Sequence, residues 1–455
     1  MTTSDVPSRA GPVPDAHRTG TRRVMRRLLP LMFGIYFLSF VDRTNVALAK
    51  SALDAQLGIT ASIYGLGAGI FFLGYALLEV PSNLVAYRVG PRRWIARIAI
   101  SWGLVSAAMM LVQGEWSFYA LRLVLGITEA GLFPALMYVT TLWFAQKDRS
   151  VAIGWIYTAP ALGLLVGNPL GGWLLHLDGL AGLRGWQWLF LLEGAATVVF
   201  GAVLFVVFPD RPRDAAWLTP AEAEAVERHA LGAPGRPHGG GAAGWIRAVR
   251  SPSTVLMGLV YFFNQVGFVG LYFFAPAMVQ QMQVSNPVLV GLLSGTVGFG
   301  FLVGVLTLPR LHRRTTGDFR FLAAATAGLV VASGLFMAAS TPWLRLALFA
   351  ATAFFAGGIL PIYWAIAMKR LQGIEAAAGL ALINTVGLLG GFAGPYLFGL
   401  AEARTGSSAS GYAIILATAI IGLALIPVLA RVSRPVGSGA RPALGLAGGE
   451  PRAEA

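Results

Sequence analysis

The chain has 455 residues, of which 56% are hydrophobic and only 12% are charged. Soluble globular domains carry about 25% charged residues, so this composition excludes an ordinary soluble protein and indicates a chain that lies mostly in lipid. The formal net charge of +14 comes from arginines in short clusters between apolar runs, which indicates membrane topology rather than nucleic-acid binding. The absence of cysteine excludes disulfides, thiolate metal sites and cysteine nucleophiles.

Both ends of the chain are expected to lie outside the membrane. Residues 1–27 are polar, basic and rich in Pro and Gly, and they lack the short apolar core and small-residue cleavage site of a signal peptide. We therefore expect a disordered cytoplasmic N-terminal tail over residues 1–27. A second disordered cytoplasmic tail is expected over residues 432–455, after the last apolar run.

Apolar runs long enough to cross a bilayer recur along the whole chain. A bilayer core of about 30 Å needs roughly 20 apolar residues per helical crossing. The pattern predicts an all-α polytopic membrane protein with two six-helix bundles, the first over residues 28–208 and the second over residues 253–431. The twelve predicted transmembrane helices are 28–48, 62–86, 94–112, 117–143, 151–175, 186–208, 253–281, 287–309, 320–340, 343–367, 375–400 and 411–431.

The longest interior polar segment, residues 209–252, separates the two predicted bundles. Its stretch "LTPAEAEAVERHA" predicts a short amphipathic helix with Thr219 as the N-cap and Pro220 at the first helical position. The Gly- and Pro-rich stretch that follows predicts a flexible linker.

The basic residues fall almost entirely on one side of the predicted membrane. The tails, the central segment and the even-numbered connections hold 28 Lys and Arg residues, the odd-numbered connections hold 4, and 2 lie within spans. Because connections rich in Lys and Arg stay in the cytoplasm, both termini and residues 209–252 are predicted to be cytoplasmic.

A faint repeat relates the two halves. "EAGLFPALM" resembles "AGGILPIYW", with Pro134 and Pro361 227 positions apart. "GNPLGG" resembles "GPYLFG", with Pro169 and Pro395 226 positions apart. These similar offsets indicate two related halves, as in many transporters.

Five ionisable residues are identified within the predicted spans, where a charge at the bilayer centre costs roughly 2.5–3.5 kcal/mol on insertion scales. Asp42 and Arg122 are expected at matching depths, roughly 9 Å and roughly 7–8 Å inside the outer boundary. Glu129 lies two turns beyond Arg122, near the midplane, without a basic neighbour at i±3 or i±4. The five residues are Asp42, Arg43, Glu79, Arg122 and Glu129.

Structural explanations remain open for several of these charges. In one alternative, Asp42 and Arg43 form a structural ion pair or reach the outer interface. In another, Glu79, which lies in "LLEVPSN" beside Pro81, only organises the cytoplasmic loop. Glu129 is the hardest to explain without a function, since a partly desolvated carboxylate near the midplane can exchange protons near neutral pH.

Two arginines and three polar residues indicate a substrate site. The guanidinium groups of Arg43 and Arg122 are always charged and match a carboxylate bidentately, which indicates an organic anion as substrate. Tyr75 is a candidate hydroxyl donor, and Asn45 and Asn384 are candidate polar wall groups. The alternative for these three residues is ordinary hydrogen bonding between helices.

The chain lacks the motifs of an enzyme or a metal site. It contains no HExxH, no GxSxG and no histidine cluster with metal-ligand spacing, so we expect neither catalysis nor a cofactor or metal. Glycine-rich stretches such as "GLGAGIFFLG" allow close helix packing, and none precedes a β-strand as a nucleotide-binding loop would.

Six stretches between residues 28 and 431 together resemble a known family. They are "YFLSFVDRTNVALA", "YALLEVPSNLVAYRVGPRRWIARIAISWG", "RLVLGITEAGLFPALMYVTTLWF", "GNPLGGWLL…LRGWQWLFLLEG", "FPDRPRDAAWLTPAE" and "AAAGLALINTVGLLGGFAGPYLFG". The resemblance is to the major facilitator superfamily and, within it, to the anion:cation symporter branch of tartrate, phthalate, glucarate, galactonate and hydroxyphenylacetate-type permeases.

This resemblance implies the major facilitator fold and proton-coupled uptake of an organic acid by alternating access. It implies that Asp42 and Glu129 carry protons. It also implies that Arg43 and Arg122 bind substrate, with Tyr75 assisting.

The segment after the second span departs from the family pattern Gly-xxx-Asp-Arg-x-Gly-Arg-Arg. Asn83 stands for the first Gly and Tyr87 for the Asp, which leaves open whether this loop locks the two halves together. The residues expected to serve structure or gating are Glu79, Asn83, Gly90, Arg92 and Arg93.

The sequence therefore predicts a proton-coupled symporter that imports a sugar acid, dicarboxylate or aromatic acid. Two alternatives remain open, an efflux antiporter or uniporter on the same fold and a membrane sensor that does not transport. We expect a monomer in the bacterial inner membrane, in contact with lipid, protons and a small organic anion, without nucleic acid.

Overall fold

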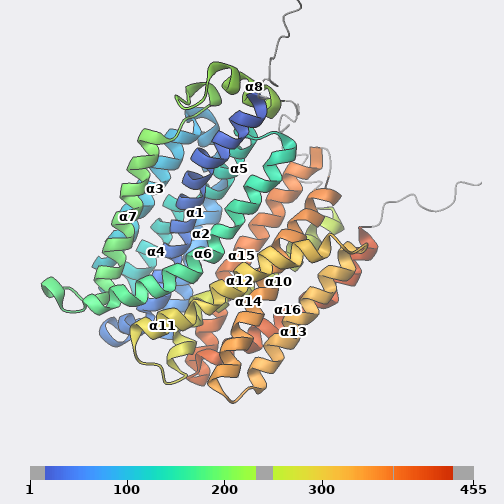
Figure 1. Cartoon of the computed structure of the whole chain (residues 1–455). Helices are drawn as coiled ribbons and strands as arrows, with labels where there is room; N and C mark the ends of the chain where they lie inside the picture. The colour runs from blue at the N-terminus through green and yellow to red at the C-terminus, as the bar shows by residue number, and fades with distance from the viewer. Residues whose placement is uncertain (1–15, 232–249, 372–373, 434–455) are drawn as a thin grey trace, which may run out of the picture.

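The structure, a computed structural model, describes residues 16–231, 250–371 and 374–433 (Figure 1). The predicted linker after the amphipathic helix, the first part of the N-terminal tail and nearly all of the C-terminal tail lie outside these residues.

Within the described residues, twelve apolar helical segments are long enough to cross a membrane, so the predicted number of spans is confirmed. Two spans consist of two helices each, α4 with α5 and α11 with α12. The helices are α1 (Ala16–Leu57), α2 (Ala61–Val89), α3 (Pro91–Ala108), α4 (Glu115–Glu129), α5 (Leu132–Trp143), α6 (Gln146–Leu174), α7 (Gly185–Val207), α8 (Pro220–Leu231), α10 (Pro252–Gln280), α11 (Pro287–Ser294), α12 (Thr296–His312), α13 (Asp318–Ala338), α14 (Pro342–Arg370), α15 (Ile374–Thr405) and α16 (Gly411–Val432).

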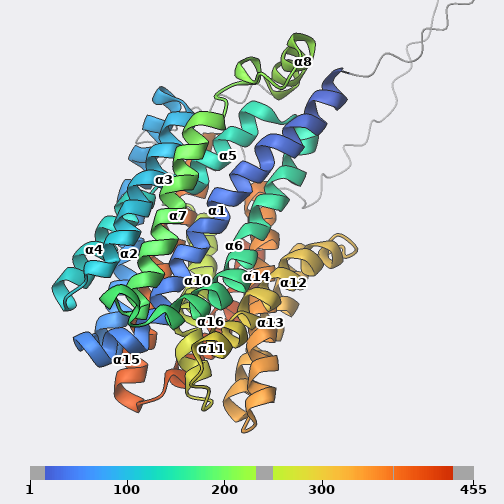
Figure 2. The same ribbon diagram turned by 60° about the vertical axis from the view of Figure 1, so that its left-hand side comes forward.

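The helices form two groups that meet along a long interface (Figure 1). Helices α1 to α7 pack mainly on one another, and so do α10 to α16. Across the interface, α2 packs on α15, α6 packs on α11 and α12, and α1 packs on α10. We call the end of the molecule that carries α8 and the start of α1 the tail face, and the opposite end the far face (Figure 2).

The first helix begins earlier than predicted. Residues 16–27, expected to belong to a disordered tail, are helical and extend α1 beyond the membrane-spanning part, where it contacts α8. Arg23 Nη1 donates to Glu222 Oε2 at 2.7 Å, and the rings of His17 and His229 stack with centroids 3.9 Å apart. Contacts with α8 therefore order this part of the N-terminus.

The predicted amphipathic helix is confirmed as α8. It begins at Pro220, and Thr219 Oγ1 accepts a hydrogen bond from the backbone N–H of Glu222 at 3.3 Å. The Glu222 carboxylate accepts in return from the Thr219 N–H at 2.9 Å. This reciprocal pair is a capping box, which satisfies two backbone donors that the first helical turn leaves free.

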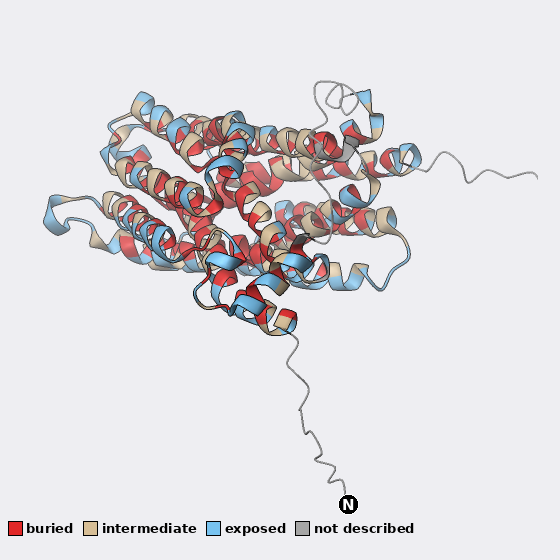
Figure 3. Ribbon diagram, turned by 90° about the horizontal axis from the view of Figure 1, so that it is seen from above, coloured by how far each residue is buried: buried red, intermediate tan, exposed pale blue. Residues whose placement is uncertain are grey.

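Apolar side chains cover the outside of the helix groups as well as the inside. Buried residues gather where helices face one another, whereas exposed residues follow the periphery (Figure 3). Trp116 and Trp343 are 81% and 77% exposed, and they begin α4 and α14 at the far face. They lie 227 positions apart, the offset of the predicted repeat, and they suit the aromatic belt of a membrane interface.

Glycines bring the two groups into backbone contact near the far face. A Cβ atom on Gly65 of α2 would lie 2.5 Å from the Pro395 carbonyl oxygen and 2.9 Å from Gly399 Cα of α15. A Cβ atom on Gly172 of α6 would lie 2.4 Å from the Pro287 carbonyl oxygen of α11. We call these two contacts the far-face seal, because neither tolerates a side chain at the glycine.

We predict that Gly65→Val opens the far-face seal. Inserting a branched side chain into a packed contact costs about 1–3 kcal/mol, which favours separation of α2 from α15. Spin labels on Thr60→Cys and Ala403→Cys, two exposed positions near the seal, should report a longer distance in the variant.

Gly422→Val is the matched control, since a Cβ at Gly422 meets nothing within 4 Å. An unchanged distance distribution in Gly65→Val would show that this contact does not hold the far face closed.

Candidate substrate and proton site

A cavity of about 820 Å³ lies between the two helix groups, on the tail-face side of the seal. Its lining comes from the tail-face halves of α2, α5, α6, α12, α14 and α15. Arg310 and Arg313 of α12 line it near the tail face, so two guanidinium groups lie at the entrance. The cavity is closed toward the far face, where the helices touch at glycines.

Glu79 and Asn384 connect the two groups at the wall of this cavity. Asn384 Nδ2 lies 2.8 Å from Glu79 Oε1 and 2.9 Å from Oε2, so the α15 amide donates to the α2 carboxylate. The two residues predicted as a gating acid and a polar wall group are thus brought together, as one hydrogen-bonded link between α2 and α15.

An ion pair between Arg43 and Glu129 lies deeper in the protein. Arg43 Nη2 is 2.6 Å from Glu129 Oε1, and the Glu129 side chain is 1% exposed. The expectation that Glu129 is an isolated carboxylate is therefore wrong, because its basic partner comes from another helix. Neither residue belongs to the lining of the cavity.

Aromatic side chains enclose the Arg43 guanidinium. Its carbon lies 4.7 Å from the ring centroid of Phe40, 5.2 Å from that of Phe71 and 5.8 Å from that of Tyr75. Tyr75, the predicted hydroxyl donor, is thus beside Arg43 and buried. The ring faces stabilise the cation, whose side chain is 13% exposed.

A break in the fourth span places Glu129 at a helix end. Glu129 is the last residue of α4, and α5 starts three residues later at Leu132, whereas one continuous helix over 117–143 was predicted. Gly131 has φ 88°, a conformation that favours glycine. The freed Ala130 carbonyl accepts from Ser82 Oγ at 2.7 Å. Gly131 followed by Pro134 was the signal for this break.

Arg122 is buried without a carboxylate in its hydrogen bonds. Its Nε and Nη2 atoms donate to the carbonyl oxygens of Gly67 and Ala68 in α2, at 3.3 and 3.4 Å. Its guanidinium carbon lies 5.0 Å from the Phe71 ring and 5.7 Å from the Phe273 ring. Long hydrogen bonds to neutral carbonyls leave this cation ready for a stronger anionic partner.

Asp42 points away from both arginines, which corrects the expectation that it is coupled to Arg122 at matched depth. Its Oδ2 accepts from Trp102 Nε1 at 2.6 Å and Thr197 Oγ1 at 3.0 Å, and its Oδ1 accepts from Ser106 Oγ at 3.0 Å. Asn45 Nδ2 adds a bond of 3.4 Å to Oδ1. Asn45, predicted as a substrate wall group, therefore lies with Asp42 between α1, α3 and α7.

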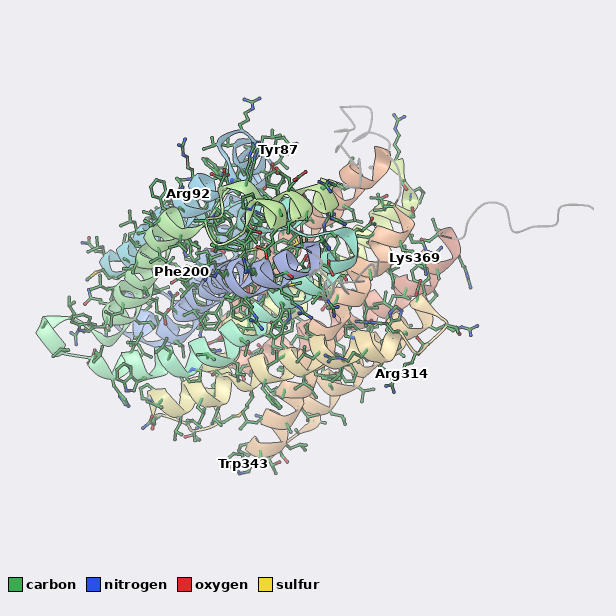
Figure 4. The ribbon with its side chains drawn as sticks, turned by 45° about the horizontal axis from the view of Figure 1, so that its top comes forward. Tyr87, Arg92, Phe200, Arg314, Trp343 and Lys369 are labelled. Carbon is green, nitrogen blue, oxygen red and sulfur yellow. The ribbon has the colours of Figure 1, made fainter. Side chains whose placement is uncertain are left out.

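The end of α2, the start of α3 and Gly90 between them hold the remaining predicted gating residues. Asn83 lines the cavity, and Arg93 is exposed. Gly90 has φ 96°, and Asp210, which follows α7, accepts from the Arg92 backbone N–H at 2.9 Å. Tyr87 stands where the family pattern has an Asp, and here the Asp210 carboxylate, from a distant part of the chain, lies against the N-terminus of α3. Tyr87 and Arg92 lie toward the tail face, away from Trp343 (Figure 4).

A second ion pair joins the two groups toward the far face. Lys50 Nζ of α1 lies 2.7 Å from Glu402 Oε1 of α15, with side-chain exposures of only 7% and 13%. Lys50 is one of the four basic residues that the predicted spans place in odd-numbered connections. A salt bridge between helices 352 positions apart in the chain has no local sequence signal.

Glu193 is a buried acid within the predicted spans that was not among the five ionisable residues identified there. It lies in the predicted span 186–208, is 5% exposed, and was visible in the sequence as the acid in "LLEGAA". The hydroxyl and indole partners of Asp42 were not recognisable in advance, because Ser, Thr and Trp are common in apolar helices.

Two closely packed helix groups, a cavity open to one face and buried charges beside it define a membrane transporter. The sequence model of the Major Facilitator Superfamily matches residues 32–395. The chain belongs to the Major Facilitator Superfamily, as the sequence motifs predicted.

Relatives and solved structures agree with this assignment. A protein of Agrobacterium vitis described as a candidate tartrate transporter is 36% identical over 90% of this chain and 91% of its own length. A quinolone resistance transporter of Acinetobacter baumannii is 34% identical over 90% of this chain and 95% of its own length. The tartrate relatives are consistent with the anion:cation symporter branch.

Two solved structures share the fold. A bacterial homologue of the human lysosomal transporter Spinster, in an inward-facing and occupied conformation, aligns with a TM-score of 0.69 at 18% identity, over 93% of this chain and 98% of its own. A D-xylose-proton symporter aligns with a TM-score of 0.68 at 16% identity, over 88% of this chain and 96% of its own. The predicted fold is therefore confirmed.

We predict that Trp102→Phe destabilises the protein, because it removes an N–H donor from a buried carboxylate. Hydrogen bonds to charged groups contribute about 1.5–3 kcal/mol, so the free energy of unfolding should fall by that amount. Reversible unfolding in mixed detergent micelles measures it.

Trp143→Phe makes the same change in volume at an indole N–H that is buried without a hydrogen-bond partner. If Trp102→Phe costs no more than Trp143→Phe, the bond between Trp102 and Asp42 contributes nothing to stability.

Proposed function

We propose that this protein is a proton-coupled symporter that imports a small organic anion, of the sugar-acid, dicarboxylate or aromatic-acid class. The observation that carries the proposal is the buried ion pair between Arg43 and Glu129, 2.6 Å apart. In such a pair, a proton can neutralise the protein carboxylate, and an anionic substrate can then bind the guanidinium in its place.

The exchange follows from charge balance. While Glu129 is ionised, it occupies the guanidinium of Arg43. A proton on Glu129 removes its charge and frees Arg43 for a substrate carboxylate, which replaces Glu129 in the ion pair. A buried Arg without either partner is unfavourable, so substrate and proton bind together, which is the requirement for symport.

Three further features favour an anion as the substrate. Arg122 donates only long hydrogen bonds to neutral carbonyls and lies beside the same Phe71 ring as Arg43. Arg310 and Arg313 line the cavity and would attract an anion that enters or leaves through the tail face. Relatives at 35 to 36% identity are described as candidate tartrate transporters.

The proposal assigns a direction to the two faces. The clustering of basic residues supports a cytoplasmic tail face, with both termini there and the protein in the bacterial inner membrane. The present conformation is then open to the cytoplasm, and alternating access moves residues 28–208 against residues 253–431. Outward opening would break the bond between Lys50 and Glu402 and would separate the far-face seal. We expect the protein to transport its substrate as a monomer.

A proton-driven efflux antiporter is the second candidate. It is favoured by the similarity to the quinolone resistance transporter, which covers almost all of both chains. In efflux, a proton entering from outside would displace the bound compound. In symport, the proton would strengthen binding of the compound.

Transport by purified protein in liposomes tests the proposal. A thermal-shift screen against dicarboxylates, sugar acids and aromatic acids, with tartrate first, selects the labelled compound. Under a gradient that is acidic outside, symport predicts accumulation of this compound inside, and dissipating the gradient should abolish it. Expulsion of a preloaded quinolone without anion accumulation would contradict symport and support the antiporter.

We predict that Glu129→Gln separates exchange from coupling. The amide keeps the shape and mimics the protonated acid, so Arg43 is permanently available to the substrate. The variant should retain counterflow exchange and fail to accumulate substrate against a gradient. Glu115→Gln, at the exposed start of the same helix, should behave as wild type. If Glu129→Gln accumulates substrate normally, the coupling proton binds elsewhere.

We predict that Arg122→Lys weakens substrate binding at least tenfold, about 1.4 kcal/mol, because an ammonium cannot offer the paired donors of a guanidinium. Isothermal binding of the selected anion measures the change. Arg97→Lys is the control, since Arg97 stacks on Trp94 at 3.9 Å in α3, away from the cavity. An unchanged isotherm in Arg122→Lys would show that Arg122 is structural.

A further inference from the structure

Glu193 of α7 is a buried carboxyl group that the proposed mechanism does not use. It is 5% exposed, and both of its oxygens are fully buried without a partner at hydrogen-bond geometry among the described residues, with the Asn45 amide as the nearby donor. A Cβ atom on Gly171 of α6 would lie 3.5 Å from Oε1, so the carboxyl group points toward the interior between α6 and α7. An ionised carboxylate without a donor in such a place is strongly unfavourable.

Asp42 is the ionisable group that faces Glu193, and Asn45 lies between them. Both come from α1, one turn apart. Thr197, one turn after Glu193 on α7, donates to Asp42, so Asp42 lies beside the turn of α7 that carries Glu193. The elements that pack around the pair contribute neutral groups, namely Trp102 and Ser106 from α3 and Gly171 from α6.

The two acids have opposite hydrogen-bond environments. Asp42 accepts from an indole, two hydroxyls and an amide, and an ionised carboxylate, which is only an acceptor, matches these four donors. Glu193 has a single donor nearby, the Asn45 amide, which does not reach hydrogen-bond geometry with it and also bonds Asp42. Two neighbouring carboxylates in one buried site cannot both remain ionised without a cation, so a proton goes to the acid that lacks donors.

The balance of buried charges near Asp42 also favours a protonated Glu193. Arg43 and Arg122 contribute two positive charges, and Asp42 and Glu129 contribute two negative charges, which sum to zero. Glu129 also acts on Asp42 electrostatically, although its hydrogen bond is with Arg43. An ionised Glu193 would leave one uncompensated negative charge, and a protonated Glu193 leaves none.

We infer that Glu193 and Asp42 form a proton-binding site inside the first helix group, in which Glu193 holds the proton and Asp42 remains ionised. This site is separate from the Arg43–Glu129 pair and does not touch the cavity. In this site Asp42 is the anionic partner of protonated Glu193. Glu193, not Asp42, is then the first of the two to accept a proton. Its use in transport rests on the proposed function, whereas the protonation itself does not.

Infrared spectroscopy of the purified full-length protein in lipid nanodiscs tests the inference without any substrate. At neutral pH, exposed carboxyl groups are ionised, so a C=O stretching band of a protonated acid reports a buried one. Wild type should show such a band, it should shift in D2O, and Glu193→Gln should lack it. Glu193→Asp, which keeps a carboxyl group at this position, should retain it.

Two controls make the result specific. Glu402→Gln should leave the band unchanged, because Glu402 is paired with Lys50 and therefore ionised. Wild type grown with carboxyl-13C glutamate should show a shifted band, which assigns the proton to a glutamate without any mutation.

Three results would overturn the inference: no protonated band in wild type, a band that survives in Glu193→Gln, or a band that labelled glutamate does not shift. Loss of the band on addition of Na+ but not K+ would also overturn it, since the pair would then bind sodium. Because no substrate is present, failure here leaves the symport proposal intact. Failure of proton-driven uptake would likewise leave a positive infrared result standing.

Discussion

The ion pair between Arg43 and Glu129 determines how the interior of this protein is arranged. A charge that cannot reach water or lipid headgroups must find a partner inside, and breaking such a pair by removing one member typically costs about 3–5 kcal/mol. The break between α4 and α5 sets Glu129 at a helix end, and aromatic rings cover Arg43. The ring contacts around Arg43 agree with this requirement, and the helix break at Gly131 places Glu129 where it meets Arg43.

The two halves share a backbone pattern but divide the chemistry unequally. Tryptophans 227 positions apart begin α4 and α14 at the far face, and both are exposed. The corresponding crossing in the second half, α14, is one continuous helix through Pro361, whereas the first half breaks at Gly131. The break coincides with the buried acid, so the first half provides the ion pair and the second half provides mainly walls and contacts, such as Asn384.

The number of crossings, the bounds of every crossing but the first to within five residues, and the α8 cap were predictable because apolar run length and capping are local properties. The extension of α1 at both ends was missed, and its early start depends on tertiary contacts with α8. The break at Gly131 was missed although Gly131 and Pro134 are a local signal for it. The buried charges were mostly identified, but their partners were not. Asp42 and Arg122 at equal depth suggested a pair, yet depth says nothing about the direction in which a side chain points around its helix. Glu129 was called isolated because only its own helix was considered.

The links between the helix groups differ in kind on the two faces. At the far face the groups touch through glycine backbones, through the nearly buried ion pair of Lys50 with Glu402, and through a hydrogen bond of 2.9 Å from Tyr64 Oη to the Phe273 carbonyl oxygen. On the cavity side the amide of Asn384 reaches Glu79. A single hydrogen bond contributes about 1 kcal/mol net, so the link on the cavity side is easily broken. Small changes in the charge of buried acids can therefore decide which face is open, which is how proton binding can direct a change of shape.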